Sequence, residues 1–383
     1  MKKPGIVCIL LSLLICLAAC SGAQKAETAA ASTEPATLPK VAIETETAPT
    51  QTAEPAETVP TEASPETLTE VPITEVPTTE VPTTEIPTTE PMPEDSPERQ
   101  AFYENFRELD PEKTDEWLIS HNALANGYSR IYVNYSGIRD AGLNLYTKQG
   151  HQVVAIDVPN GILIIRTKLN NSNTVMAIAK KPERLHLYPA AHLGSYGERI
   201  ASIASRNNGV LAMNGSCFDD PNGSGNGGTI EGYCMCGGTA YGSPMGWAFS
   251  RFELLESNWA IVTQAGGPAS ASTTDCVEFM PALIINGVKQ SPGAWTDNQP
   301  RAAIGQNSHK DILMVVVEGR YQDSPGCAVN LIADLMLKYD GINAVNVDGG
   351  TTAIMWYRGQ ILNRCSNPNT PGGRYLPNAW VYK

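Results

Sequence analysis

The sequence AVNVDGGTTAIMWYRGQILNRCSN occupies residues 344–367. Its apolar, β-branched start predicts a buried strand, which breaks at the triplet Asp348-Gly349-Gly350 and is expected to resume as a strand from Thr351. Glycines let backbone N–H groups approach an anion closely, and the hydroxyls of Thr351 and Thr352 can donate to it. The same residues also suit a plain Asp-Gly turn between two strands. The stretch therefore predicts either a small site for a polar ligand or a simple turn.

The first twenty residues have the pattern of a signal segment. Lys2 and Lys3 precede an apolar core over residues 6–17, which is too short for an ordinary membrane-spanning helix. The core ends at Leu17-Ala18-Ala19-Cys20, which resembles a bacterial lipobox and implies cleavage before Cys20 with diacylglyceryl attachment to its sulfur. An uncleaved anchor is the alternative. Both predict that the rest of the chain lies outside the membrane, at the bacterial cell surface.

The formal net charge of −13 comes from one part of the chain. Residues 21–100 hold 16 acidic and 3 basic side chains, a balance of −13, whereas residues 101–383 hold 24 and 22, a balance of −2. The remaining +2 belongs to Lys2 and Lys3. A nucleic-acid-binding surface would show a basic patch or stripe. No nucleic-acid partner is therefore expected.

Residues 21–95 are predicted to form a disordered stalk. They are rich in Thr, Glu, Pro and Ala, and residues 69–91 repeat every five positions as TEVPI, TEVPT, TEVPT, TEIPT and TEP. Proline at this spacing excludes helix, and the like charges repel one another. Such a segment reaches about 50 Å as a flexible coil and roughly 200 Å if fully extended, so either form holds a domain away from a membrane. Glycosylation of its threonines is left open by the sequence.

Six cysteines follow Cys20, an even number that permits disulfides outside the cytoplasm. They are Cys217, Cys234, Cys236, Cys276, Cys327 and Cys365. The Cys234-Met-Cys236 spacing is too tight for a zinc knuckle, and no Cys–His cluster completes a metal site. We expect one or two disulfides together with free buried thiols, and no metal centre or other cofactor.

The folded part is predicted to begin with a helix at Ser96. Serine at the N-cap, proline at the first helical position and an acid in the first turn are helix-start signals. A second short helix over 113–125 completes a helical segment, residues 96–128, that either caps the following domain or continues the stalk.

Residues 129–383 are predicted to form one mixed α/β (α+β) domain with strand-rich sheets and flanking helices. Strands are expected over 131–135, 143–147, 152–158, 162–168, 175–179, 210–214, 260–263, 282–286, 302–306, 312–317 and 344–347, and helices over 196–208 and 327–339. Residues 312–348 thus form a strand–helix–strand unit, and the glycine-rich residues 219–246 form a long loop.

Polar side chains at the ends of predicted buried strands are the candidates for chemistry. They are Asn214, Arg301, Glu318, Arg320, Asp348 and Asn378. Taken singly, each is more often a strand-end hydrogen bond or a solvated charge. Together, two arginines, two carboxylates and two amides suit a ligand with a phosphate and several hydroxyls, because arginine binds phosphate bidentately and two carboxylates can divide acid and base roles.

Several enzyme classes lack their signatures in this sequence. There is no G-x-S-x-G elbow, no H-E-x-x-H, no P-loop, and no G-x-G-x-x-G after a strand in a βαβ unit. The five histidines stand singly, with no partner pattern.

Five blocks of the chain are MNGSCFD (213–219), PRAAIGQ (300–306), LMVVVEGR (313–320), NVDGGTTAIM (346–355) and LPNAWVY (376–382). These blocks resemble those of the phosphodiester glycosidases, the family of the NAGPA-type domain. They stand in the order of the family and cover roughly residues 195–383, whereas members typically read NGGFF, PRTAIG, VDGR, DGGGS and ANA.

The resemblance implies which residues line the site. Asn214, Arg301, Arg320, Gly349, Gly350, Thr351, Thr352 and Asn378 would bind substrate, with Asp348 and Glu318 as catalytic carboxylates. Glu318 stands where the family has aspartate, Thr351 and Thr352 stand where it usually has glycine or serine followed by serine, and Ser216-Cys217 replaces a Gly-Phe pair. Which carboxylate acts as acid, base or nucleophile stays open, since it depends on their separation.

These observations lead to one expectation and two alternatives. The expectation is a lipid-anchored, extracytoplasmic hydrolase that cleaves the sugar C1–O bond of a glycosyl (GlcNAc-like) phosphodiester in a cell-surface glycan or sugar-phosphate polymer. One alternative is a non-catalytic glycan-binding module on a stalk, favoured by the departures at Glu318 and Thr351. The other is an assembly factor for cell wall or exopolysaccharide that uses the fold as a scaffold.

Overall fold

The computed structural model describes residues 96–134, 142–246 and 248–383. The predicted signal segment, Cys20 and the 21–95 stalk lie outside the described residues. The α-helices are α1 (Pro97–Asn105), α2 (Pro111–Ser120), α3 (Ile200–Arg206) and α4 (Val329–Leu337). In the described part of the chain, no helix is long and apolar enough to cross a membrane.

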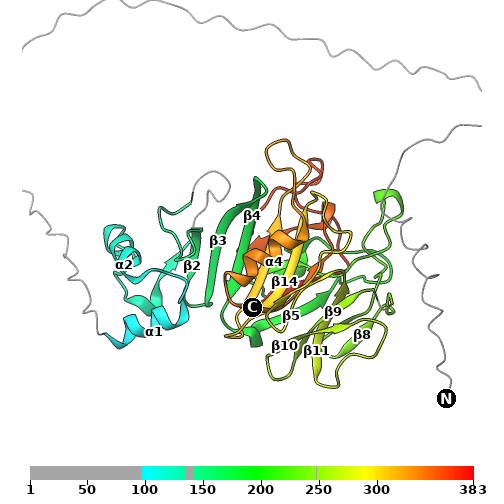
Figure 1. Cartoon of the computed structure of the whole chain (residues 1–383), viewed down its shortest axis with the longest axis horizontal. Coiled ribbons are helices and arrows are strands. Elements are labelled where there is room, and N and C mark those ends of the chain that lie inside the picture. The colour runs from blue at the N-terminus through cyan, green and yellow to red at the C-terminus, as the bar shows by residue number, and fades with distance from the viewer. Residues whose placement is uncertain (1–95, 135–141, 247) are drawn as a thin grey trace, which may run out of the picture. The chain divides into compact units, whose positions relative to one another are not determined.

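The described strands form three sheets (Figure 1). The first has nine strands in the order β1 (Tyr132–Val133), β2 (Gln152–Asp157), β3 (Ile162–Leu169), β4 (Ser172–Ala179), β15 (Ile312–Val317), β14 (Arg301–Asn307), β16 (Gly341–Val347), β12 (Ala282–Ile285) and β13 (Val288–Lys289). The second is β10 (Ala260–Gln264), β9 (Ser250–Leu255), β11 (Thr273–Phe279), β7 (Cys234–Cys236) and β8 (Thr239–Tyr241). The third is β18 (Gln360–Ile361), β17 (Met355–Tyr357), β6 (Leu211–Asn214), β19 (Asn378–Tyr382) and β5 (Leu185–Pro189).

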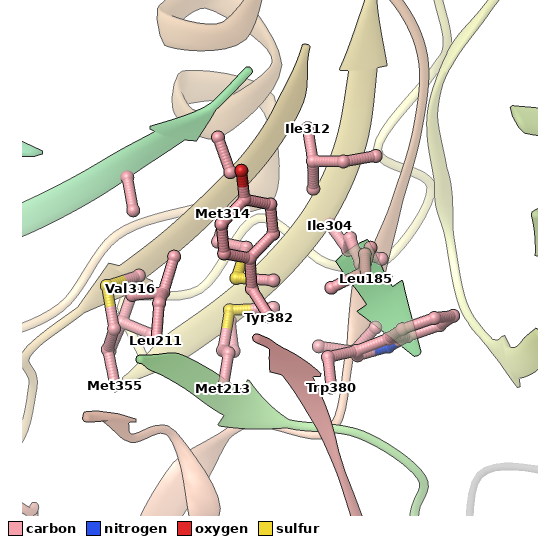
Figure 2. Packing of buried hydrophobic residues seen from close by; sticks show 14 of the residues in the cluster. Leu185, Leu211, Met213, Ile304, Ile312, Met314, Val316, Met355, Trp380 and Tyr382 are labelled. Carbon is pink, nitrogen blue, oxygen red and sulfur yellow. The ribbon is translucent and has the colours of Figure 1, made fainter. Parts of the chain in front are cut away.

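The nine-stranded sheet is buried on both faces, and β15 shows why. Its sequence ILMVVV has no polar residue, and alternate side chains point to opposite faces of a strand. Ile312, Met314 and Val316 enter a core shared with the two smaller sheets, including Met213 and Trp380. Figure 2 shows these side chains packed between β15 and the strands of the third sheet.

The opposite face of the nine-stranded sheet is covered by helices. Leu313, Val315 and Val317 of β15 pack in a second core with apolar residues of α1, α2 and α4. In Figure 1, α1 and α2 lie beside β2. The smaller helix α3 instead packs on the third sheet, where Ile200 and Ile203 contact the cluster around Trp356. The α+β class with strand-rich sheets is confirmed, and every described strand pair is antiparallel.

The N-terminal helices belong to this packing. Ser96 accepts a hydrogen bond from the Arg99 backbone N–H at 3.2 Å, so α1 begins with the predicted cap. Lys180, at the end of β4, is 1% exposed and pairs with Glu108 at 2.6 Å and Asp311 at 3.0 Å. Charges buried to this degree require partners, so this network fastens the segment after α1 to the sheet.

Some predicted elements are different in the structure. The strand expected to resume at Thr351 is a 3₁₀ turn over Gly350–Thr352, and β17 begins only at Met355. Residues 143–147 form isolated bridges instead of a strand. The expected loop over 219–246 contains the hairpin β7–β8, which pairs with β11. Strands β5, β9 and β11 were not predicted, because charged or polar residues interrupt their apolar pattern.

The predicted disulfides do not form among five of the cysteines. Cys217, Cys234, Cys236, Cys276 and Cys327 are free thiols, and all but Cys217 are buried. The Cys365 thiol lies 3.5 Å from the Pro371 carbonyl oxygen.

Candidate active site

Three predicted site residues meet at one edge of the nine-stranded sheet. Strand β14 lies between β15 and β16 and is antiparallel to both. Its first residue, Arg301, pairs with Val317, the last residue of β15, and Ala302 pairs with Val347, the last residue of β16. Glu318 and Asp348 directly follow those two strands. The strand order therefore brings Arg301, Glu318 and Asp348 to the same edge.

Asp348 is half-buried and begins the turn that includes Gly349 and Gly350. Burial raises the pKa of Asp348 to about 7, against the lowering effects of the Thr352 hydroxyl and the Arg374 charge. A carboxyl with this pKa exchanges a proton near neutral pH, which is what general acid–base catalysis requires.

The glycines of this turn are required by close contacts. A Cβ on Gly349 would stand 2.8 Å from the Pro300 carbonyl oxygen, and Gly350 has a φ of 60° and donates its N–H to the same oxygen at 2.9 Å. A side chain at Gly349 would displace the chain next to Arg301, and one at Gly350 would be strained by the positive φ and would press on the Arg320 guanidinium. The turn thus holds Asp348 against the start of β14.

Glu318 has a different environment from Asp348. It is 4% exposed, and its carboxylate accepts hydrogen bonds from the Arg364 backbone N–H at 2.6 Å and the Arg364 Nε at 2.8 Å. A third bond comes from the Asn173 side chain at 3.1 Å. These three donors occupy the carboxylate and fix residue 364 beside the end of β15.

The two predicted arginines are held to different degrees. Arg301 is 4% exposed; its Nε donates to the Cys327 carbonyl at 3.2 Å and its Nη2 to Asp297 at 2.7 Å. Arg320 is exposed and donates from Nε to the Gln299 side chain at 3.2 Å. Its guanidinium also lies against the turn, since a Cβ on Gly350 would be 3.3 Å from Nη2. Arg320 is thus the more accessible of the two for an anionic ligand.

The two asparagines connect the third sheet to the site. Asn214, the last residue of β6, donates to the Asp348 carbonyl at 2.6 Å and accepts from the Ile354 N–H at 3.1 Å. Asn378, the first residue of β19, accepts from the Ser216 N–H at 2.7 Å and donates to the Ser216 hydroxyl at 2.9 Å. Both side chains are buried and bonded to the protein, so they position neighbouring segments of the site.

Three residues near Asp348 were not predicted as site residues. Cys217 follows the β6 strand and is half-buried, and Asp348 contributes to the elevated pKa of its thiol after burial, the largest cause. Arg374 donates to Asp220 at 2.5 and 2.7 Å and to the Thr351 hydroxyl at 3.3 Å. Asp220 and Arg374 are 154 positions apart, so no local pattern could have paired them.

A separate groove of about 690 Å³ lies along α2 and contains none of the predicted site residues. It is lined by residues of α2 such as Trp117, by His121 directly after this helix and by the segment 144–148. Within the described residues, no group of three or more histidine, cysteine or acidic side chains is arranged to hold a metal ion.

Two solved structures are similar to this chain at low sequence identity. One is the catalytic domain of zebrafish N-acetylglucosamine-1-phosphodiester alpha-N-acetylglucosaminidase, auto-inhibited by its pro-peptide. It is 15% identical over 58% of this chain and 81% of the zebrafish chain, with a TM-score of 0.49. The other is a hypothetical protein from Synechocystis, 13% identical over 60% of this chain and 63% of its own, with a TM-score of 0.44. No curated protein sequence matches this chain.

A family model matches the C-terminal part of the chain. Its description is phosphodiester glycosidase (NAGPA), and the match covers residues 207–383. This range begins just before β6 and includes every predicted substrate-binding and catalytic residue. Residues 207–383, which carry the Asp348 turn and the strands around it, are therefore similar to the phosphodiester glycosidase family.

Proposed function

We propose that the protein is a hydrolase that cleaves the sugar C1–O bond of glycosyl phosphodiesters in cell-surface glycans. The observation that carries the proposal is the environment of the Asp348 carboxyl. Asp348 is half-buried, with a pKa raised to about 7, on a turn against which the exposed Arg320 guanidinium lies. An acid–base group beside an arginine suits a substrate in which the leaving group is a phosphate.

In the proposed reaction, Asp348 acts in its ionised form. It takes a proton from water, the water oxygen bonds to C1, and the bond between C1 and the phosphate oxygen breaks. The phosphate keeps that oxygen and leaves as a phosphomonoester, which needs little protonation because it is already a stable anion. Arg320 holds the phosphate, and its charge stabilises the negative charge that develops there. The glycosidic carbon, and not phosphorus, is the reacting centre.

The remaining predicted residues support this arrangement. Arg301 and Glu318 are bonded to neighbouring protein groups on the same sheet edge as Asp348. Their geometry favours a positioning role, in which Glu318 fixes Arg364 and Arg301 fixes the chain before β14. Thr351 is partly exposed and offers its hydroxyl to sugar or phosphate oxygens. Thr352 is 3% exposed and donates its hydroxyl to the Gly349 carbonyl, so it holds the turn instead of facing a ligand.

The alternative of a non-catalytic glycan-binding module is favoured by one observation. The second candidate carboxylate, Glu318, accepts three hydrogen bonds from protein donors and is 4% exposed. A pair of reactive carboxylates is therefore not formed by Asp348 and Glu318 as they stand. The two functions differ in a single measurable property, turnover.

The experiment uses the full-length protein in detergent and a GlcNAc-1-phosphodiester model compound. Reducing sugar and phosphomonoester are assayed separately, and the reaction is repeated in ¹⁸O-labelled water. We expect both products, with the label in the sugar, and a loss of at least about 100-fold in Asp348→Asn. The matched control is Asp334→Asn on α4, which should keep full activity. Label in the phosphate would show P–O cleavage, and binding of the glycan without products would favour the binding module.

The proposed location follows from the N-terminal sequence. The proposal holds the protein at the outer face of the bacterial membrane through a lipid on Cys20, with the 21–95 segment as a spacer between lipid and domain. Its partners are then the membrane and a surface glycan or sugar-phosphate polymer. Labelling cells with a radioactive fatty acid tests this: label in the wild-type protein but not in Cys20→Ser is expected, and equal label in both would refute the anchor.

A further inference from the structure

Arg374 connects the glycine-rich segment after β6 to the Asp348 turn. Its two terminal nitrogens donate to the two carboxylate oxygens of Asp220 at 2.5 and 2.7 Å. Nη2 also donates to the Gly225 carbonyl at 2.8 Å, and Nη1 to the Thr351 hydroxyl at 3.3 Å. One guanidinium therefore binds both segments.

Asp220 also forms a hydrogen bond within the same segment. Its Oδ1 accepts the Gly225 N–H at 2.7 Å, so residues 220–225 form a ring that is completed by the Arg374 side chain. The Arg374 side chain is only 12% exposed, and its guanidinium lies 4.9 Å from the centre of the buried Phe218 ring. A bidentate, partly buried pair of this kind is geometrically specific, unlike an ordinary surface ion pair.

The pair also contributes charge next to the proposed catalytic carboxyl. The positive charge of Arg374 lowers the pKa of Asp348, and the negative charge of Asp220 raises it. Burial also raises this pKa and is the largest of the effects. The other groups that face this turn are the Thr352 hydroxyl, the Cys217 thiol with Glu231 behind it, and Arg320 beside Gly350. Arg374 is the cation that most directly opposes burial at Asp348.

We propose that Arg374 and Asp220 are a positioning pair: together they latch residues 220–225 onto the Asp348 turn and set the charge balance that Asp348 meets. This inference rests on the proposed hydrolase for its effect on activity, although the latch itself does not. Neither residue needs to touch the reacting atoms.

The two variants Arg374→Gln and Asp220→Asn separate this role from a merely structural one. Both variants loosen the segment and hydrate Asp348, which lowers its pKa by a similar amount in each. The charge changes act in opposite directions in addition to this effect: Arg374→Gln leaves Asp220 unopposed, whereas Asp220→Asn leaves Arg374 unopposed. In the proposed role the pH midpoint of hydrolysis is therefore higher in Arg374→Gln than in Asp220→Asn, and we expect a difference of roughly 1–2 pH units.

The first arm of the experiment is the pH dependence of kcat/KM for the full-length protein and both variants on the GlcNAc-1-phosphodiester model compound. A higher midpoint in Arg374→Gln than in Asp220→Asn supports the proposal. Equal midpoints in the two variants, or the reverse order, overturn it.

The second arm needs no turnover. Full-length proteins are digested briefly with a broad-specificity protease, and cleavage within residues 220–225 is followed by mass spectrometry. We expect cleavage there to be at least about tenfold faster in Arg374→Gln than in wild type. The control is Lys289→Gln, which removes the exposed Lys289–Asp334 pair and should match wild type.

The two arms distinguish the possible failures. An inactive wild-type protein whose segment becomes labile in Arg374→Gln refutes the hydrolase and retains the latch. Equal protection of the segment in wild type and Arg374→Gln refutes the latch, whatever the activity.

Discussion

The side-chain amide of Asn214 donates to the backbone carbonyl of Asp348 at 2.6 Å, although the two residues are 134 positions apart. The same side chain accepts the Ile354 N–H at 3.1 Å. Asn214 ends a strand of the third sheet and Asp348 follows a strand of the first. One side chain thus joins both ends of the 348–354 segment to a different sheet, and fixes the backbone of the proposed catalytic residue without using its carboxylate.

Replacing Asn214 should destabilise the protein more than its single side chain suggests. Asn214→Ala leaves the Asp348 carbonyl and the Ile354 N–H without their partner, and each unsatisfied buried group costs about 1–3 kcal/mol. We expect a loss of about 2–4 kcal/mol in the free energy of unfolding by urea. Asn214→Asp keeps the acceptor for Ile354 but places a buried carboxylate against the Asp348 carbonyl, so it should lose at least as much. Equal, small losses in both variants would contradict this bridging role.

The stability of the protein should depend on the ionisation of Asp348. Its pKa is near 3.8 in the unfolded chain and about 7 in the folded one, so the folded state holds the proton more tightly. The stabilisation from this group is complete below about pH 4 and is lost as the pH rises through 7.

Asp348→Asn cannot ionise and should therefore lack this loss. Relative to wild type, the variant should gain on the order of 3 kcal/mol between pH 4 and pH 8, at about 1.4 kcal/mol per pKa unit. Urea unfolding of both proteins at each pH measures the difference. A constant difference between the two proteins would mean that Asp348 has an ordinary pKa.

Hydrolysis should become faster as the pH rises through about 7, the pKa of Asp348. A phosphate ester leaves from C1 without strong protonation, so the ionised carboxylate is the useful form. The measurement is kcat/KM against pH with the GlcNAc-1-phosphodiester model compound. A rate that instead falls through this range would assign Asp348 the role of a general acid.

Glu318→Gln should affect stability more than chemistry. The change removes the charge that Arg364 meets in a buried pair, so we expect a loss on the order of 2 kcal/mol in unfolding free energy. We expect kcat to stay within about tenfold of wild type, compared with the 100-fold or greater loss typical of a missing acid–base group. The control is Asp323→Asn, which removes the exposed second partner of Arg364. A kcat loss as large as that of Asp348→Asn would make Glu318 a catalytic residue.

Lys180→Met should loosen the N-terminal helices. The change leaves Glu108 without its cation and Asp311 with Arg107 alone, and breaking a buried pair in this way costs about 3–5 kcal/mol. Hydrogen exchange should quicken in residues 97–120 before it does in β15. Partial recovery at low pH is expected, since protonated carboxyls need no cation. Unchanged exchange in 97–120 would show that apolar packing alone holds these helices.

The sequence was most informative where local chemistry and burial agree. The run ILMVVV predicted a strand, which the fold buries on both faces, and the Ser96-Pro97 pair predicted the start of α1. The Asp348 triplet predicted a turn at the end of a strand, and this turn is the centre of the candidate site.

The second sheet was largely missed because its strands bury charge. Strand β9 carries Arg251 and Glu253, and β11 carries Asp275 and Glu278, all within 1% of complete burial. Arg251 and Glu278 pair at 2.6 Å across the two strands. In a sequence such residues interrupt the apolar alternation that marks a strand, and only the register brings each to its partner.

The same limit applies to the candidate site. Asp348, Arg301 and Glu318 stand at strand ends and could be found from the pattern. The bonds of Glu318 to Arg364, and of Arg374 to Asp220, join residues 46 and 154 positions apart. Sequence spacing has no information about such pairs. Only the fold shows which charged side chains are open to a ligand and which are already bonded to other protein groups.

The close approach of Gly349 to the Pro300 carbonyl determines where this protein can be redesigned. The inner side of the turn has no space for any other residue, since a Cβ there would be 2.8 Å from that oxygen. Near Asp348, two positions are partly exposed: Thr351 in the turn and Cys217 after β6. A library aimed at new sugar substrates should therefore leave the two glycines unchanged and vary these two side chains.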